Sequence, residues 1–351
     1  MKNTQLESRI YFTEKDIYDA LMSSKRKMSM SLLTELARDR GILISSDDTR
    51  EDIIKYLSSL VYDYYDLKVL IDHITPAHKK EKAKVTQVNG KIDGTTLKSV
   101  TKEINDNNVT IQTTIDSKDQ NTTILQIEYD EIDFSKTRLR QKVRKESTIE
   151  VTVKDGLTTI SKPSNDKTDE IMKKILDGIE KKTATPLIEK KINLFELKHE
   201  DKIGYFTKLI NAIEDCKLKD VVKVSVNHED KPEAEDDAVQ VITNASFKGK
   251  GLLSTQEYQN LKKEGYYITS IIWTSDEIKK NGDIIEFEAS ISSSKDCEEL
   301  SFAAKGAYRF IDKDRYTTGR RPLKTEEIKK YTSYLEEASF KIFDEITEKE
   351  L

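Results

Sequence analysis

The sequence predicts an α+β fold with a small N-terminal helical module, an antiparallel β-meander and a larger mixed α+β C-terminal body. Three patterns lead to this prediction. Apolar residues recur at helical spacing in residues 1–77, they alternate with polar residues between 122 and 160, and both patterns occur in the remainder. A chain of 351 residues has room for two or three domains.

The first segment, residues 1–77, is expected to be helical. Thr13 and Thr49 are favourable N-caps, each followed three residues later by an aspartate, and Gly41 is a suitable helix end. The stretch "LVYDYYDLKVLIDHI" carries apolar residues around most of a helix surface, so we expect it to be buried against the other helices. The predicted helices cover residues 14–24, 31–41, 50–60 and 60–74.

The second segment, residues 78–183, combines a β-meander with one helix. Its strands have a period of two, and Gly156 and clusters of Asn and Asp supply turns. Isoleucines at 171, 175 and 179 predict an amphipathic helix over 169–182. The predicted strands cover residues 122–134, 136–145 and 147–160.

The third segment, residues 184–351, alternates helical and extended patterns and ends in a long helix. Its predicted helices cover 201–216, 254–265 and 325–350. Its predicted strands cover 220–227, 237–247, 266–275, 283–292 and 299–311.

Composition and charge restrict the classes of protein. Hydrophobic residues make up 36% and charged residues 35%, so a buried core is feasible. The net charge of -5 means that nucleic-acid contact requires local basic patches. No stretch approaches the roughly 18 apolar residues of a membrane span, and no signal peptide is recognisable, so we expect a cytoplasmic protein without a membrane partner. The excess of Lys over Arg and the frequent Ile and Asn are typical of an AT-rich bacterial or phage genome.

Signatures of catalysis and cofactor binding are missing from the sequence. Cys216 and Cys297 are far apart, and the four histidines have no metal-ligand spacing. There is no Gly-rich phosphate loop and no nucleophile motif. Glu286 and Glu288 lack the following lysine that a nuclease strand needs. We therefore expect no cofactor, no metal site and no catalytic residue, which favours a non-enzymatic protein.

A helix pair in the first segment carries a family resemblance. Leu33, Leu36 and Gly41 mark one helix, "ILISS" is an extended connector, and Ile53, Ile54 and Leu57 mark a second helix. This pattern resembles the SAP-like helix–extension–helix modules, a group that includes DNA-binding domains and similar Rho N-terminal modules. The resemblance implies that basic residues in and beside the module contact DNA. These are Lys25, Arg26, Lys27, Arg38, Arg40 and Arg50.

The turn before the second helix departs from that pattern. Such modules commonly have a Gly-x-Lys turn there, whereas this chain has Asp47 and Asp48 followed by Thr49 and Arg50. Two carboxylates repel a phosphate, although they also complement the positive end of a helix dipole. The module is therefore either a DNA contact or a structural and protein-docking element.

The stretch "SKTRLRQKVRKE" is the most basic local pattern. As a strand it would place alternate cations on one face, in a row about 27 Å long at ~3.4 Å per residue. Such a row could follow several phosphates. In the alternative interpretation, Glu128, Asp130 and Glu150 on neighbouring strands pair with these cations. The residues concerned are Lys136, Arg138, Arg140, Lys142 and Arg144.

A weaker anion-binding candidate lies before the closing helix. Arg315, Arg320 and Arg321 accompany Gly319 in a predicted loop, and arginine forks suit phosphate or carboxylate. An ordinary surface loop explains the same residues.

Two functions follow from these patterns. The leading expectation is a non-enzymatic nucleic-acid-binding protein, with DNA favoured and contacts driven by backbone charge. The alternative is a protein-interaction adaptor or scaffold in a bacterial multi-protein system such as phage defence. The oligomeric state has no signal in the sequence.

Overall fold

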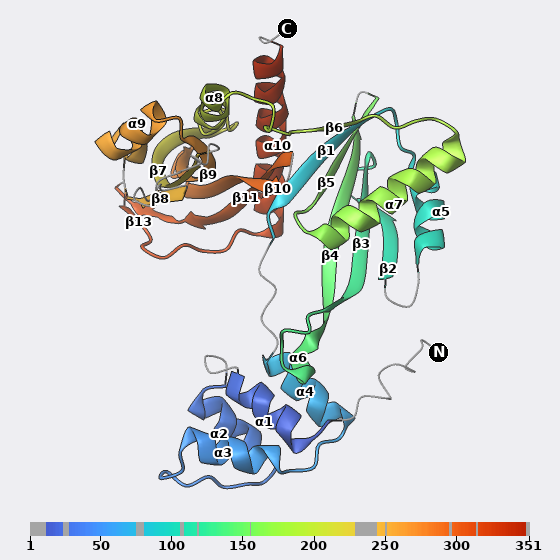
Figure 1. Ribbon diagram of the computed structural model, residues 1–351, viewed down its shortest axis with the longest axis vertical. Coiled ribbons are helices and arrows are strands. Elements are labelled where there is room, and N and C mark those ends of the chain that lie inside the picture. Colours follow the sequence, from blue (N-terminus) through green and yellow to red (C-terminus); the bar gives the residue numbers. More distant parts are fainter. Residues whose placement is uncertain are drawn as a thin grey trace, which may run out of the picture. The chain divides into compact units, whose positions relative to one another are not determined.

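The protein has an α+β fold and divides into two compact units (Figure 1). Unit 1 contains residues 1–80, 105–111 and 126–147, and unit 2 contains 81–104, 112–125 and 148–351. Residues 126–147, which hold the basic stretch, thus belong to the same unit as the N-terminal helices. The computed structural model describes residues 12–23, 28–74, 81–105, 109–117, 119–154, 156–228, 244–249, 251–294, 297–313 and 315–348.

Unit 1 is built around a small helical core. Its helices are α1 (Glu14–Ser23), α2 (Met30–Arg38), α3 (Arg50–Ser58), α4 (Tyr64–Ile74) and the single turn α6 (Arg138–Gln141). Apolar residues at helical spacing, among them Ile17, Leu21, Leu33, Ile53 and Leu57, are buried together. The four helices predicted in this segment are therefore confirmed.

The predicted helix ends of unit 1 are also confirmed. The Thr49 side chain accepts a hydrogen bond from the Asp52 backbone N–H, and Asp52 accepts one from the Thr49 backbone N–H. Thr13 and Asp16 make the same reciprocal pair. Gly41 follows α2 with a φ of 73°, a conformation that glycine adopts at low cost. Local side-chain chemistry alone fixes these boundaries.

The expected burial of the fourth helix is wrong in part. Leu70 and Ile74 of α4 lie in the core, but Tyr65 is 74% and Val69 50% exposed. Val61, just before the helix, is 90% exposed. The described helices of unit 1 cover only one side of α4, so its second apolar face remains at the surface.

The predicted strand over 136–145 is also wrong. Residues Arg138–Gln141 form α6, and β4 (Lys142–Lys154) begins only at Lys142. The reason is tertiary: Leu139 is buried in the helical core, and α6 packs against α1 and α4. One helical turn brings this leucine inward, whereas a continuous strand would keep the cations in a row.

The described strands include eleven in one sheet. Their order is β2-β3-β4-β5-β1-β11-β10-β9-β7-β8, with β6 pairing with β1, and the boundary between the units cuts β2, β3 and β4. Beyond β4 they are β1 (Ala83–Asn89), β2 (Val109–Ile115), β3 (Thr122–Ile132), β5 (Leu157–Pro163), β6 (Glu189–Lys191), β7 (Cys216–Asn227), β8 (Asn244–Lys248), β9 (Tyr267–Glu277), β10 (Ile284–Ser294) and β11 (Cys297–Tyr308). A hairpin of β12 (Phe310–Asp312) and β13 (Arg315–Tyr316) lies outside this sheet.

Strand β1 has divided pairing. It pairs with β5 over all seven of its residues, so β5 occupies one of its edges throughout. Its other edge pairs with β11 at Ala83 and Phe302 and with β6 over Thr86–Val88. Strands β1 and β11 therefore separate after one position, and the segment around β6 enters between them.

Helices pack on the sheet of unit 2. In Figure 1, α7 (Asp166–Thr183) lies across one face of the sheet, and α5 (Gly94–Ile104) lies beside α7. Helices α8 (His199–Leu209) and α10 (Thr325–Thr347) pack together, and their apolar faces join a core around Trp273 and Phe287. Helix α9 (Gln256–Lys263) completes the described helices longer than one turn, none of which could span a membrane.

Most predicted elements of unit 2 are confirmed, with two differences. The helix expected over 201–216 ends at Leu209, and Cys216 already begins β7. In addition, the helix α5 and the strands β1 and β2 were not predicted from the sequence. Residues 237–243 of the strand expected over 237–247 lie outside the described part of the chain, and β8 accounts for its end.

Gly306 in β11 generates a stability prediction. A Cβ at this position would lie 2.6 Å from the backbone oxygen of Arg321, which is itself hydrogen-bonded to Ala307. Because this oxygen is fixed, Gly306→Ala should lower the free energy of unfolding by about 2 kcal/mol or more. The control is Gly319→Ala, where a Cβ meets no atom within 4 Å and the free energy of unfolding should change by less than about 0.5 kcal/mol. Chemical denaturation of the two variants measures both values, and equal effects would contradict the prediction.

Candidate functional site

The basic stretch of unit 1 is paired with acidic residues. Lys142 contacts Asp130 at 3.0 Å, and Arg144 contacts Glu128 at 2.9 Å. Lys136 lies 3.5 Å from Asp133. The contacts of Lys142 and Arg144 match the cross-strand alternative, in which acids of the preceding strand neutralise the cations. Asp133 instead follows that strand, and Glu150 lies 3.5 Å from Lys329 rather than beside these cations. Each of these pairs is half-exposed at its basic end, so the cations are solvated as well as paired.

The two arginines of α6 contact helix α1, one near its start and one at its last residue. Arg138 lies 3.5 Å from a carboxylate oxygen of Asp16, and Arg140 lies 3.5 Å from the hydroxyl oxygen of Ser23. Leu139, which lies between these two arginines in the sequence, is buried. The structure therefore does not bring the five cations into one row, and α6 uses two of them within unit 1.

The cations of the helical module have different roles. Arg40 forms an ion pair of 2.7 Å with Asp66 and stacks over the Tyr62 ring at 4.0 Å. The Arg50 guanidinium donates to the backbone oxygens of Leu21 and Met28. Arg38 is exposed at the end of α2. Lys25, Arg26 and Lys27 lie outside the described residues.

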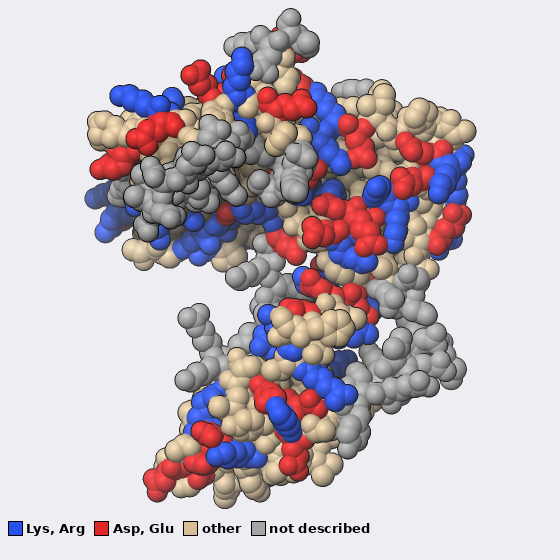
Figure 2. Space-filling view, viewed as in Figure 1, with Lys and Arg blue, Asp and Glu red and all other residues tan. Residues whose placement is uncertain are grey.

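The acidic turn before α3 shapes the local backbone. Asp48 accepts a hydrogen bond of 2.9 Å from the Ser45 backbone N–H. The described helical segments 12–23 and 28–74 carry twelve acidic and six basic side chains, a formal charge of -6. Over residues 1–80 of the full sequence, thirteen acidic and thirteen basic side chains balance. Figure 2 shows acidic and basic side chains interspersed on its visible face, with broad uncharged surface over the unit 1 helices.

The three arginines near the closing helix are all engaged with carboxylates. Arg315 contacts Asp312, and Arg320 contacts Glu286. Arg321 bridges Asp283 at 2.6 Å and Glu327 at 2.7 Å, and this pairing lowers the pKa of Glu327 to about 2. The Arg321 fork therefore holds the start of α10 against the sheet, because Asp283 precedes β10 and Glu327 lies in the first turn of α10.

An exposed apolar stripe on unit 1 is a second candidate site. Tyr65 and Val69 are four residues apart and therefore lie on one side of α4, and Val61 is exposed in the segment just before this helix. Nine of the fifteen large apolar side chains that are exposed among the described residues belong to unit 1, which holds fewer than a third of those residues. Such a concentration is typical of interaction surfaces.

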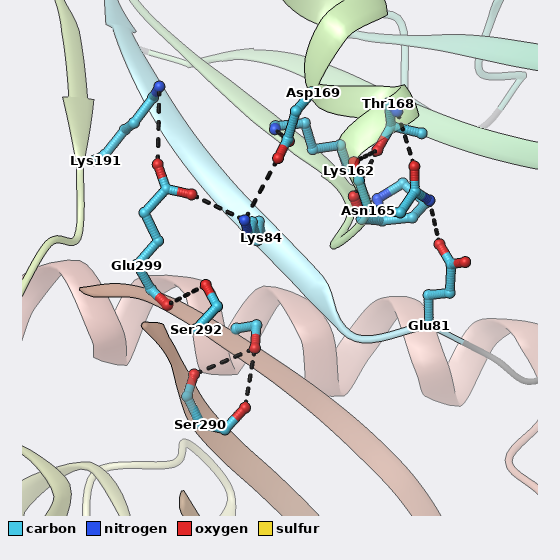
Figure 3. A network of polar contacts seen from close by, with 12 residues as sticks. Glu81, Lys84, Lys162, Asn165, Thr168, Asp169, Lys191, Ser290, Ser292 and Glu299 are labelled. Atoms are coloured by element: carbon cyan, nitrogen blue, oxygen red, sulfur yellow. Dashed lines mark hydrogen bonds and ion pairs between the residues drawn. The ribbon is translucent and has the colours of Figure 1, made fainter. Parts of the chain in front are cut away.

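A polar cavity in unit 2 is a third candidate, which the sequence did not predict. It has a volume of about 490 Å³ and is lined by β1, β5, β6, β11 and α7. Lys84 on β1 lies between two acids, 2.9 Å from Glu299 and 3.4 Å from Asp169 (Figure 3). Lys162 on β5 pairs with the same Asp169, and Lys191 on β6 lies 3.9 Å from Glu299.

Burial and mutual repulsion perturb one lysine of this cavity. The Lys162 side chain is 9% exposed, and burial together with the neighbouring Lys84 lowers its pKa to about 8. The three lysines lie on three strands more than twenty residues apart, so no local motif could reveal the cluster. Among the described residues, no group of His, Cys, Asp or Glu could hold a metal ion.

Comparison of the chain with known proteins does not assign it to a family. The chain matches no family model and no curated protein sequence.

The contacts of Arg50 predict a structural role for this residue. Lysine cannot reproduce the two-carbonyl contact of the guanidinium, so Arg50→Lys should lower the free energy of unfolding of unit 1 by about 1–3 kcal/mol. Amide hydrogen exchange of α1 and α3 reports this unit. The control is Arg38→Lys at an exposed site, which should change the free energy of unfolding of unit 1 by less than about 0.5 kcal/mol. Unchanged exchange in Arg50→Lys would refute the structural role.

Proposed function

We propose that the chain is a protein-interaction adaptor and that unit 1 is its docking module. The observation that carries the proposal is the stripe of Val61, Tyr65 and Val69, of which Val61 is 90% exposed. Removing such side chains from water contributes about 1.5–3 kcal/mol for each one fully buried. Two or three of them therefore supply enough free energy for a specific contact.

The acidic residues beside the stripe indicate the kind of partner. Asp63 and Asp72 lie close to the stripe in sequence. We therefore propose a protein partner that presents an apolar face bordered by lysine or arginine. Complementary charge favours encounter with such a partner and disfavours acidic ones.

Nucleic-acid binding, the leading expectation from the sequence, has less support than docking. Lys136, Arg138, Lys142 and Arg144 have acidic partners within unit 1. A phosphate would have to compete with these carboxylates for each cation. Lys25, Arg26 and Lys27 remain predicted contacts outside the described residues.

Site-specific photocrosslinking in native cells identifies the partner. A photoreactive residue at Tyr65 should capture a protein that the same group at Lys15, on the acidic helix α1, does not. That protein is then purified, and its affinity for the full chain is measured by titration calorimetry. Capture of a second copy of this chain would instead indicate self-association, which sedimentation tests, and would overturn the adaptor.

Substitution of the stripe supplies the decisive prediction. Tyr65→Ser with Val69→Ser should weaken binding of the purified partner about a hundredfold, from the loss of roughly 3 kcal/mol of apolar burial. The matched control is Ile188→Ser with Ile278→Ser, which removes two comparably exposed apolar side chains from unit 2 and should leave the affinity unchanged.

Two results contradict the docking proposal. One is equal affinity of the stripe variant and the wild-type chain for the purified partner. The other is salt-dependent binding of the chain to DNA or RNA in fluorescence anisotropy that Arg138→Glu with Arg140→Glu abolishes, because this would restore the nucleic-acid function.

A further inference from the structure

The cavity of unit 2 contains charged groups in alternating order. The ammonium of Lys162 pairs with Asp169, Asp169 with Lys84, Lys84 with Glu299, and Glu299 with Lys191 (Figure 3). These residues come from β5, α7, β1, β11 and β6 in turn. The divided pairing of β1 creates this arrangement, because β1 and β11 separate and leave space beneath α7.

Exposure differs among these five residues. The side chains of Lys162 and Lys84 are 9% and 14% exposed, whereas Glu299 is 23%, Asp169 34% and Lys191 44% exposed. The two most buried members are therefore cations, and Asp169 has access to water. An acid in this position can rotate into solvent at small cost, whereas a buried ammonium needs an anionic partner wherever it points.

Lys84 contacts two carboxylates and Lys162 only one, so Lys162 is the less neutralised of the two buried lysines. Burial and the charges of Lys84 and Lys191 disfavour the ammonium form of Lys162, and Glu299 and Glu189 only partly offset them, so its pKa falls to about 8. The other charged groups facing the cavity, Glu170, Lys173 and Asp177, lie on α7. An anion placed beside Lys162 would favour its ammonium form, so binding there is coupled to the ionisation of this lysine.

The walls of the cavity suit an organic ligand. Val85, Ile160, Met172 and Leu176 contribute apolar surface beside the charged row. A volume of about 490 Å³ is within the range of small-molecule sites, which combine apolar walls with a few convergent polar groups. The site therefore offers an apolar compartment and a cationic end.

We propose that this cavity binds a small organic anion whose charged group contacts Lys162 and Lys84, displacing Asp169 toward solvent, while its apolar body lies against α7. The contact is non-covalent, and the shared chemistry is that of a phosphate monoester or a carboxylate. This inference concerns unit 2 alone and is independent of the docking function proposed for unit 1.

Titration calorimetry of the full chain with simple probes tests the site. Phenyl phosphate and benzoate share an apolar ring and differ in the anionic group, and benzyl alcohol is the uncharged control. At least one of the two anions should bind at millimolar or lower concentration with one-to-one stoichiometry, and benzyl alcohol should bind much more weakly. The preferred anion shows whether phosphate or carboxylate is the natural group. Absence of saturable binding by both anions overturns the proposal, as does equal binding of the alcohol.

Variants locate the binding. Lys162→Met keeps the length and apolar stem of the side chain and should weaken the anion about tenfold to a hundredfold. Lys181→Met removes an exposed lysine at the other end of α7 and should have no effect. Equal affinity of Lys162→Met and the wild-type chain, or an equal loss in Lys181→Met, refutes the site.

A measurement on the wild-type chain keeps the proposal testable should Lys162→Met fail to fold. Binding of an anion beside Lys162 raises the pKa of this lysine, so near pH 8, where the free group is about half protonated, complex formation takes up about half a proton. Near pH 6, about two units lower, Lys162 is already protonated and its own uptake should be close to zero. Benzoate is ionised at both pH values, and the proton that phenyl phosphate itself exchanges near its second pKa of about 6 is subtracted. Calorimetry in two buffers of different ionisation enthalpy measures this number, and equal uptake at both pH values contradicts the proposal.

Discussion

The divided pairing of β1 is the constraint on which the architecture of unit 2 depends. One edge of this short strand is satisfied along its whole length by β5, while the other is shared between β11 and β6. Because β1 and β11 separate after one position, the side chain of Lys84 lies between α7 and β11 and needs partners on both. Asp169 and Glu299 supply them. The same separation leaves the cavity and buries Lys162 at its inner end. Strand geometry, charge pairing and the candidate binding site thus have a single origin.

In unit 1, several cations make contacts within the unit. Arg50 donates hydrogen bonds to two backbone oxygens, Arg40 pairs with Asp66, and Arg138 contacts Asp16 on α1. The exposed surface of unit 1 includes the apolar stripe of Val61, Tyr65 and Val69. A surface with those properties matches a protein partner better than a polyphosphate, which needs unpaired cations.

The sequence predicted features that depend on neighbouring residues and failed where distant residues decide. The Thr49 and Asp52 cap, Gly41 and the isoleucine spacing of α7 are local, and all were predicted correctly. The alternation through Arg138 and Arg140 fits a strand equally well, and only the burial of Leu139 between α1 and α4 selects a helical turn. The apolar surface of α4 indicated burial, but the number of helices available to cover it is a tertiary property. The lysine cavity had no signal, because its members meet only through the order of the strands.

The ionisation of Lys162 tests the account most directly, because it reports whether the buried charges beside β1 are incompletely neutralised. Its side-chain Cε resonance, assigned by comparison with Lys162→Arg, can be followed by NMR as pH rises in the ligand-free chain. The account predicts a titration midpoint near 8. A midpoint at or above the ordinary lysine value of 10.5 would show that Asp169 and Glu299 satisfy the site fully, and would contradict the claim that it is open to an anion.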